Sequence, residues 1–301
     1  MALSLYKIKK WKDMLLGKSI YHVLQDEGTE YSKNEVRGYY NNLTLKVKNS
    51  DISDNSVPMY HVESGEKMYF PIGIFQYGLG AYDLYLKNND KDMLEKVINC
   101  ANWAVENQQE NGGWVTFAHE NKEKPYSAMA QGEGISLLIR AHIATNDKKY
   151  MDSVYKAKDF MLVSIEDGGT SEYKDGELFL YEFTYEPLVL NGWIFSLWGL
   201  WDYVVYTEDN NAREFLQCTI DTLEKTLPKY DNSYWSKYDM GKRICSGFYH
   251  RLHIAQLNVM YELTGKEAFK LYADRWNKYS KSFFKSKFAF VKKVIQKVFE
   301  K

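Results

Sequence analysis

The feature that most constrains the fold is a repeat of apolar segments along the chain. From Tyr69 onward, four such segments end at polar turns near Asp90, Asp147, Asp209 and Lys266, spaced by 57, 62 and 57 residues. A more charged segment with helical spacing follows each apolar one. An apolar helix alternating with an amphipathic helix is the pattern of inner helices covered by outer helices. The repeat therefore predicts a mainly α protein, an incomplete (α/α) toroid of helical hairpins.

Polar and aromatic loops precede the four apolar segments and enter the same end of each predicted inner helix. They should therefore gather at one rim of the toroid, which is where we expect the functional site. The third loop contains Asp175-Gly176, a favourable two-residue turn, so short β-hairpins are expected in the rim loops. The four loops are Val62–Pro71, Gly112–Gln131, Gly168–Pro187 and Tyr230–Gly247.

The segments on either side of the repeat differ from it in character. Residues 1–60 are rich in Ser, Asn, Asp and Gly, and we interpret them as a wrapping segment with short strands around Leu43–Val47. Residues 61–280 form the predicted toroid. Residues 281–301 contain seven Lys and one Glu, with apolar residues at helical spacing. This basic amphipathic tail should either lie on an anionic membrane surface or pack on the toroid.

The composition narrows the class of protein. The 301 residues are 45% apolar, which allows a large core. Cys100, Cys218 and Cys245 are far apart, so they predict neither a disulfide framework nor a zinc site, and they fit a reducing compartment. The basic N-terminus has no apolar run typical of a signal peptide. We therefore expect a cytoplasmic protein, in solution or peripheral on the inner face of the membrane. No nucleic-acid partner is expected.

Chemistry-bearing residues concentrate between Tyr238 and Leu257. From Lys229 to Gln256 there are five Lys or Arg and two Asp, a local charge of +3. The second half of this stretch is expected to be a helix. Within it, Tyr249, His253 and Gln256 share one face because they are spaced i, i+4, i+7. The pattern is typical either of a cleft wall or of a polar network on a surface helix.

Six motifs, in order and with similar spacing, give the chain a resemblance to the C-terminal catalytic domain of D-glucuronyl C5-epimerases, which act on heparan sulfate and heparosan precursors. The resemblance covers about residues 60–280 and implies an incomplete α/α toroid. The motifs are Phe70-Pro-Ile…Gln76-Tyr-Gly-Leu, Asn111-Gly-Gly-Trp, Ala128-Met-Ala-Gln-Gly, Val189-Leu-Asn-Gly, Tyr230-Asp…Tyr238-Asp and Tyr249-His…His253-Ile…Gln256-Leu.

The resemblance implies three catalytic tyrosines. The first lies ten residues before the Asn of Val-Leu-Asn-Gly, which is Tyr181 in this chain. The second belongs to the later of two Tyr-Asp pairs eight residues apart, which is Tyr238. The third precedes His in the last motif, which is Tyr249. All three positions of the family pattern are therefore occupied by tyrosine.

The chain also departs from the family's animal members. They place a Glu before the first Tyr, where this chain has Leu180 and carries Glu182 after it instead. They place an Arg where this chain has Gly241, followed by Lys242 and Arg243. Their N-terminal β-rich domains have no counterpart, so the chain resembles a short, bacterial-type form. These differences put in doubt whether the chain binds its substrate, and prefers sulfated or unsulfated glycan, as the animal enzymes do.

C5 epimerisation removes the proton next to the uronate carboxylate and returns one to the opposite face. It needs a base, an acid and a positive charge that stabilises an enediolate-like intermediate. Lowering a tyrosine pKa from ~10 to about 7 requires roughly 4 kcal/mol, which nearby cations can supply and burial opposes. We therefore expect the +3 stretch to lower the pKa values of Tyr238 and Tyr249. These two either face opposite sides of the sugar or share a relay, and Tyr181 completes the set.

Several side chains near these tyrosines are candidates for substrate binding. His250, Arg251 and His253, together with Lys242 and Arg243, could tune the phenols or pair with the uronate carboxylate. Each has an ordinary alternative. For example, His253 could hydrogen-bond within the helix packing, and Arg251 could be a solvated surface charge.

Further candidates lie near the starts of the predicted inner helices. Gln131 and Glu133 open the second one, where a helix N-terminus favours an anion, although Glu133 could be a plain helix-start residue. Asn191 either caps the third inner helix or contacts the sugar. Tyr77 and Trp114 could stack on a sugar ring or pack in the core.

The leading interpretation is a polysaccharide glucuronyl C5-epimerase that needs neither a cofactor nor a metal. A uronic-acid polysaccharide lyase would share the first proton abstraction but then expel the C4 substituent. A glycoside hydrolase would need two opposed carboxylates, for which Glu133, Glu182 and Asp239 are available. A non-catalytic glycan-binding module is the remaining alternative. The predicted partner is a uronic-acid-containing polysaccharide or lipid-linked glycan, and the resemblance implies a homodimer.

Overall fold

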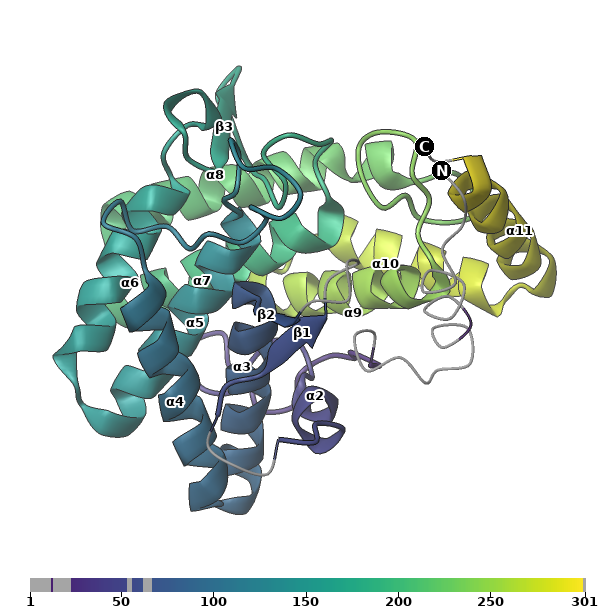
Figure 1. Ribbon diagram of the computed structural model, residues 1–301. Coiled ribbons are helices and arrows are strands. Elements are labelled where there is room, and N and C mark those ends of the chain that lie inside the picture. The colour runs from purple at the N-terminus through teal and green to yellow at the C-terminus, as the bar shows by residue number, and fades with distance from the viewer. Residues whose placement is uncertain (1–11, 13–22, 53–55, 62–66, 300–301) are drawn as a thin grey trace.

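The body of the protein is a row of helical hairpins that curves into an open ring (Figure 1). The computed structural model describes residue 12 and residues 23–52, 56–61 and 67–299. Within these residues the predicted incomplete (α/α) toroid is confirmed. The inner helices are α3 (Pro71–Asn88), α5 (Ala128–Thr145), α7 (Leu190–Thr207) and α9 (Gly247–Thr264). The outer helices are α4 (Lys91–Asn107), α6 (Lys148–Met161), α8 (Asn210–Thr226) and α10 (Glu267–Lys281).

A recurrent two-residue corner makes each inner helix fold back into its outer partner. Asn89, Asn146 and Glu208 end the first three inner helices in the left-handed conformation, and Gly265 does so in the fourth. In the first three corners an aspartate follows, and its side chain accepts a hydrogen bond from the next helix. These polar corners are why the sequence repeat ends at Asp90, Asp147 and Asp209.

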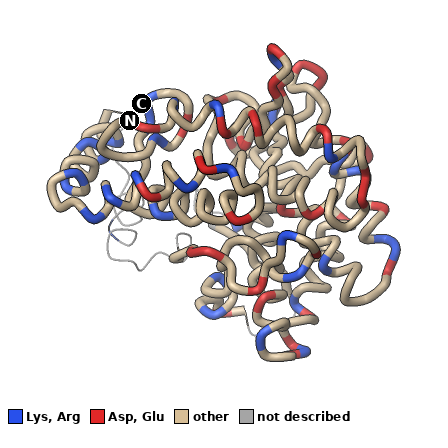
Figure 2. Tube along the Cα trace, turned by 180° about the vertical axis from the view of Figure 1, so that it is seen from behind, with Lys and Arg blue, Asp and Glu red and all other residues tan. Residues whose placement is uncertain are grey.

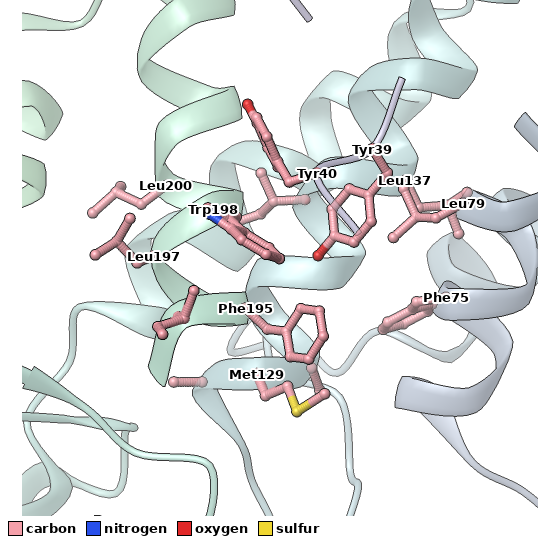
Figure 3. Close-up of a cluster of buried hydrophobic side chains, with 14 of the residues drawn as sticks. Tyr39, Tyr40, Phe75, Leu79, Met129, Leu137, Phe195, Leu197, Trp198 and Leu200 are labelled. Carbon is pink, nitrogen blue, oxygen red and sulfur yellow. The ribbon is translucent and has the colours of Figure 1, made fainter. Parts of the chain in front are cut away.

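The inner helices pack closely because small residues lie where they cross. A Cβ atom added at Gly199 in α7 would lie 2.2 Å from the Cα atom of Gly132 in α5. The aromatic core beside this crossing joins the N-terminal segment to the ring (Figure 3). There the Trp198 ring lies 5.9 Å from that of Tyr39 and 5.4 Å from that of Phe195. All three are almost completely buried.

The N-terminal segment contacts the C-terminal halves of the inner helices. Asp83, Arg140 and Asp202 each lie twelve residues after the first residue of their helix. Asp83 accepts from the Tyr39 amide at 2.8 Å, and Asp202 accepts from the Tyr40 hydroxyl at 2.7 Å. The Arg140 side chain donates to the backbone carbonyls of Arg37 and Gly38.

One expectation for the N-terminal segment is wrong. Strands were predicted around Leu43–Val47, but Thr44–Lys48 form a short helix, α2. The carbonyl oxygen of Leu43 approaches α3 at Gly80, where a Cβ atom would lie only 2.5 Å away. A helical turn lets Leu43 and Val47 both face the ring. Residues 1–11 and 13–22 of the predicted wrapping segment lie outside the described residues.

The third rim loop contains an expected β-hairpin, and a second hairpin lies partly in the first loop. Strands β3 (Ser171–Lys174) and β4 (Glu177–Leu180) pair antiparallel, and Asp175 and Gly176 between them have φ angles of 52° and 76°. Strands β1 (Met59–His61) and β2 (Lys67–Tyr69) pair before α3, while residues 62–66 between them lie outside the described residues. Two short 3-10 turns, η1 (Ile165–Asp167) and η2 (Leu227–Tyr230), flank the hairpin and helix α8.

The four rim loops touch one another in sequence order. The Phe117 ring lies 5.8 Å from Phe70 and 4.3 Å from Phe183, which joins the first three loops. The ion pair between Glu186 and Arg243 joins the third loop to the fourth. The loops therefore converge at the N-terminal ends of the inner helices, opposite the N-terminal segment.

The last helix, α11 (Phe283–Phe299), lies beside the fourth rim loop at one end of the ring (Figure 1). The described residues include no helix long and apolar enough to cross a membrane. In Figure 2 the turns of α11 carry Lys and no acidic residue, whereas both signs of charge are mixed over the rest of the surface.

Candidate active site

Two tyrosines from adjoining segments form the centre of the site. Tyr238 lies in the fourth rim loop and Tyr249 in the first turn of α9, which Ser246 caps. Their rings meet edge to face with centroids 4.9 Å apart. The loop is fixed because the Tyr238 carbonyl accepts from the Leu190 amide and the Tyr238 amide donates to the Arg243 carbonyl. The structure thus brings two of the three predicted catalytic tyrosines into direct contact.

A guanidinium group lies over this pair. The Arg243 carbon Cζ is 5.3 Å from the centroid of the Tyr238 ring. Arg243 forms ion pairs with Asp239, which is buried, and with Glu186, which is half-buried. The Asp239 carboxylate also accepts from the Gly241 amide at 2.8 Å. The cation is therefore held in place next to the tyrosines, but two carboxylates already share its charge.

Glu182 is a further acidic group of the site, and it is not paired with Arg243 by an ion pair. It is 7% exposed, and its Oε2 atom has no hydrogen-bond partner. Its side chain lies against the start of α7, where a Cβ atom at Gly192 would meet Glu182 Oε2 at 2.3 Å. Burial raises the pKa of Glu182 to about 8, although Arg243 acts in the opposite direction. The same carboxyl group is close enough to raise the pKa values of Tyr238 and Tyr249.

The expectation that the cationic stretch lowers the tyrosine pKa values is wrong in this structure. Burial raises the pKa of Tyr238 well above its usual value, and it raises that of Tyr249 as well. A side-chain hydrogen bond from Tyr238 opposes the shift of Tyr249 only in part. The physical reason is that burial outweighs the charge of Arg243, which lowers the pKa of Tyr238 only in part and is itself paired with Asp239 and Glu186. Both phenols are consequently protonated near neutral pH.

Tyr181 points to a different part of the rim. Its hydroxyl donates to Glu172 of β3 at 2.6 Å, and burial together with this carboxylate raises its pKa. Its backbone carbonyl accepts from the Ala128 amide at 2.8 Å, which ties the third loop to the start of α5. The neighbouring residue, Glu182, is the one whose charge raises the pKa values of Tyr238 and Tyr249.

The two histidines are uncharged and belong to the packing of α9. His250 is 1% exposed, stacks on Trp235 with centroids 3.6 Å apart, and accepts at Nδ1 from the Ser236 amide. Its Nε2 atom then donates to the Trp276 carbonyl at 3.0 Å. Burial lowers the pKa of His250 to about 3 and that of His253 well below its usual value. Neither histidine carries a charge near neutral pH, so their predicted role in tuning the phenols or binding the uronate carboxylate stays a prediction, and it would rest on neutral imidazoles.

Three further candidates are buried residues that pack in the core or hold a loop in place. Trp114 is completely buried, donates to the Ala104 carbonyl at 2.8 Å and packs on Phe75, so it is not a sugar platform. Tyr77 is 2% exposed and is likewise part of the core. Gln131 donates to the Gly112 carbonyl and accepts from the Trp114 amide, so its side chain holds the second rim loop in place.

The remaining predicted residues divide between the ring interior and the surface. Asn191 does not cap its helix, because Val189 is the N-cap residue of α7. Arg251 and Lys242 are exposed. Glu133 is completely buried, and its Oε1 atom accepts from Gln76 at 2.7 Å. Burial raises the pKa of Glu133 well above its usual value.

Several buried polar atoms inside the ring have no protein partner. Buried polar groups are nearly always hydrogen-bonded, so a group of unpartnered ones is typical of a site for a polar ligand. Two interactions join residues of this group. Gln256 donates to the Asn191 carbonyl at 3.1 Å, and the charge of Glu182 acts to raise the pKa of Glu133. The atoms are Glu133 Oε2, Glu182 Oε2, Asn191 Oδ1, His253 Nε2 and Gln256 Oε1.

Sequence reasoning missed two residues of this interior. It noted Glu182 only as a departure from the family pattern and as a carboxylate that a hydrolase could use. It did not identify Lys46 of α2, whose pKa burial lowers to about 8 while Glu133 acts in the opposite direction. Lys46 alternates with apolar residues in a segment that was expected to form strands. Nothing in the sequence therefore indicated that Lys46 lies close to Glu133.

A family model described as the D-glucuronyl C5-epimerase C-terminus matches residues 108–278, a span that includes Tyr181, Tyr238 and Tyr249. The D-glucuronyl C5-epimerase of Caenorhabditis elegans is 31% identical over 210 residues, which are 60% of this chain and 34% of that protein. The uncharacterized protein MJ1128 of Methanocaldococcus jannaschii is 29% identical over 155 residues, 50% of each chain. The chain thus spans a third to a half of the length of these relatives.

Among solved structures, the unsaturated glucuronyl hydrolase of Bacillus sp. GL1, described as responsible for the degradation of glycosaminoglycan, is similar with a TM-score of 0.47. The two are 10% identical, and the match covers 73% of this chain and 60% of the hydrolase.

Proposed function

Because the chain belongs to the family of D-glucuronyl C5-epimerase C-terminal domains, we propose that it inverts C5 of D-glucuronate residues in a polysaccharide to give L-iduronate. A heparosan-like glycan, free or lipid-linked, is the proposed substrate. The observation that carries the proposal is the contact of Tyr238 with Tyr249 beside Glu182 and Arg243, inside the span that the family model matches.

The tyrosine pair acts on one face of the sugar. A sugar ring between two phenol rings would need about 7–8 Å between their planes, two van der Waals contacts of roughly 3.5–4 Å each. The 4.9 Å between the centroids of Tyr238 and Tyr249 leaves no such space. Of the two arrangements that the sequence left open, the structure thus favours a relay. The opposite face is left to Tyr181, the third catalytic tyrosine that the resemblance implies, whose hydroxyl would exchange its bond to Glu172 for the sugar.

The ionised form of Glu182 supplies the proton acceptor of the relay, and its share of the protein grows as the pH approaches the pKa of about 8. A phenol takes the C5 proton while its own proton passes to the Glu182 carboxylate, so that one negative charge moves from the carboxylate to the substrate. A carboxyl group with a pKa of about 8 exchanges protons readily near neutral pH. Reprotonation by a neutral phenol on the opposite face gives the inverted centre. The raised tyrosine pKa values suit this acid role.

Arg243 stabilises the charge that develops on the uronate carboxylate. The guanidinium group has five donors, and its ion pairs with Asp239 and Glu186 use Nε and Nη2. The substrate carboxylate competes with Glu186, whose side chain is 36% exposed, and leaves the buried Asp239 pair in place. Such an exchange moves the cation's charge toward the enediolate-like intermediate, where it lowers the barrier.

Proton exchange tests the proposal directly. The protein is incubated with heparosan in deuterated water, and NMR measures deuterium at C5 and the ratio of glucuronate to iduronate. Deuterium with iduronate, and no absorbance from unsaturated ends, is the expected result. Absorbance with chain shortening would show a lyase, and shortening without absorbance would show a hydrolase. Glycan binding without exchange, across a panel of uronic-acid polysaccharides, would show a binding module.

A further inference from the structure

Helix α11 is attached to the rim loop by its polar side. Gln296 donates to the Lys242 carbonyl at 2.9 Å and accepts from the Ile244 amide at 3.1 Å. Lys285 donates to the Ser233 carbonyl at 2.9 Å. Ala289, 1% exposed, packs beside Trp235 and Cys245. Lys285, Ala289 and Gln296 share one helix face because they are spaced i, i+4, i+11.

The other side of α11 presents apolar side chains to the surroundings. Phe284, Val291, Ile295 and Val298 are spaced i, i+7, i+11, i+14, so they form one stripe. They are 84%, 52%, 47% and 51% exposed. An amphipathic helix normally buries its apolar face against the protein. In α11 the side that carries Lys285, Ala289 and Gln296 is bound and this apolar stripe is left outside, so the helix is oriented for contact with something else.

The charge of α11 indicates what this partner is. Residues 283–299 contain five Lys and no Asp or Glu. Lys287 and Lys292, both outside the hydrogen bonds to the rim loop, lie over the rings of Phe283 and Phe288. A Phe-rich apolar stripe flanked by lysines is complementary to a surface that is apolar inside and anionic at its boundary. A second copy of α11 is disfavoured, because it would bring five more lysines to the same place.

We propose that α11 docks the protein on an anionic lipid surface, with the stripe of Phe284, Val291, Ile295 and Val298 inserted among the acyl chains. The inference does not depend on the proposed catalytic activity. A cavity of about 430 Å³ between α11 and the start of α9 adds apolar contact area for an acyl chain, since it is lined by Trp235, Phe248, Phe290 and Val294 among others.

The docking orients the tyrosine loop. Residues 242 and 244, which Gln296 holds by their backbone, lie within a few residues of Tyr238 and Tyr249. The lipid surface and the candidate active site are therefore on the same end of the ring. A glycan attached to that surface would reach the rim loops without crossing the protein.

The test is vesicle flotation with the full chain. Vesicles of phosphatidylcholine alone are compared with vesicles that also contain phosphatidylglycerol, at low and high salt. We expect binding to the anionic vesicles, weakened by salt, and a loss of about tenfold or more in affinity for the double variant Phe284→Glu, Val291→Glu. The matched control is Leu271→Glu, because Leu271 is 56% exposed but lies on α10. Circular dichroism confirms that each variant is folded.

Three results would overturn the proposal. One is that the chain does not float with anionic vesicles. Another is that the double variant and the Leu271→Glu control bind equally. The third is that analytical ultracentrifugation shows a dimer that the double variant, and not the control, converts to a monomer, which would make the stripe a contact between copies.

Discussion

At the scale of single residues, the environment decides which chemistry each candidate can perform. Tyr238, Tyr249 and Glu182 are each shifted by burial toward their neutral forms. The charge that would reverse this shift belongs to Arg243, which is occupied by carboxylates. A phenol in such a site is present in its protonated form, and it accepts a proton only if its own proton has somewhere to go. Glu182 provides that destination.

The tyrosine pair should be indispensable for exchange at C5. We expect Tyr238→Phe and Tyr249→Phe each to lower the rate of C5 deuterium incorporation by about 10²–10⁴-fold, because each removes one hydroxyl of the relay. Tyr234→Phe is the matched control, since Tyr234 lies in the same loop but its ring packs on Phe288 of α11. Equal rates in all three variants would rule out the relay.

Glu182 should make stability depend on pH. Its folded pKa of about 8 exceeds the usual value of 4.5, so between these values the folded state holds a proton that the unfolded state has lost. The group's contribution to the free energy of unfolding therefore falls as pH rises, by up to about 1.4 kcal/mol per pH unit. Urea denaturation at pH 5 and pH 8 should show Glu182→Gln gaining stability over the wild type as pH rises. A constant difference would mean that the pKa is not raised.

At the scale of elements, the fold is built from one hairpin unit whose corners and crossings are fixed by a few small or polar residues. Left-handed residues end the inner helices, and aspartates start three of the outer ones. Glycines allow α5 and α7 to cross with their backbones close together. The rim loops inherit their common position from these units, because each loop precedes an inner helix.

The helix crossing can be tested with a pair of glycines. Gly199→Ala places a Cβ atom 2.2 Å from Gly132, and we expect a loss of about 1–3 kcal/mol in the free energy of unfolding from overpacking. Gly247, the first residue of α9, has no atom within 4 Å of an added Cβ. Gly247→Ala should therefore be close to neutral in the same urea titration. Similar losses for both would point to a general effect of helix glycines.

At the scale of the whole molecule, the ring has two different ends. The rim loops, the tyrosines and α11 lie at the N-terminal ends of the inner helices. At the other end, the N-terminal segment is bonded to α3, α5 and α7 through Asp83, Arg140 and Asp202. The Arg140–Asp202 ion pair, 2.5 Å long, is completely buried. This end is built for stability, and the opposite end carries the site.

Breaking the buried ion pair should destabilise the whole protein. Asp202→Asn leaves the Arg140 guanidinium without a counter-charge, and we expect a loss of roughly 3–5 kcal/mol in the free energy of unfolding. The control is Asp274→Asn, which breaks the exposed pair with Lys270 on α10 and should change stability little. Chemical denaturation of both variants provides the measurement. An Asp202→Asn variant as stable as the control would show that the pair is not needed to hold the two segments together.

The sequence by itself determined the repeat, the alternation of inner and outer helices, the β-turn at Asp175-Gly176 and the positions of the family tyrosines. These are local properties, because helical periodicity, capping residues and turn residues act over a few positions along the chain. They were sufficient for the toroid and for the convergence of the rim loops.

Only the tertiary structure decided which side chains from distant parts of the chain contact one another. Trp114 and the two histidines were attractive site residues by type, and packing uses them inside the protein. Glu182 became a central group because adjacent residues of an extended loop face opposite ways, which turns Tyr181 toward Glu172. The orientation of α11 could not be predicted from the sequence either. Periodicity identifies a polar and an apolar face, but only contacts with the rim loop show which of them is bound.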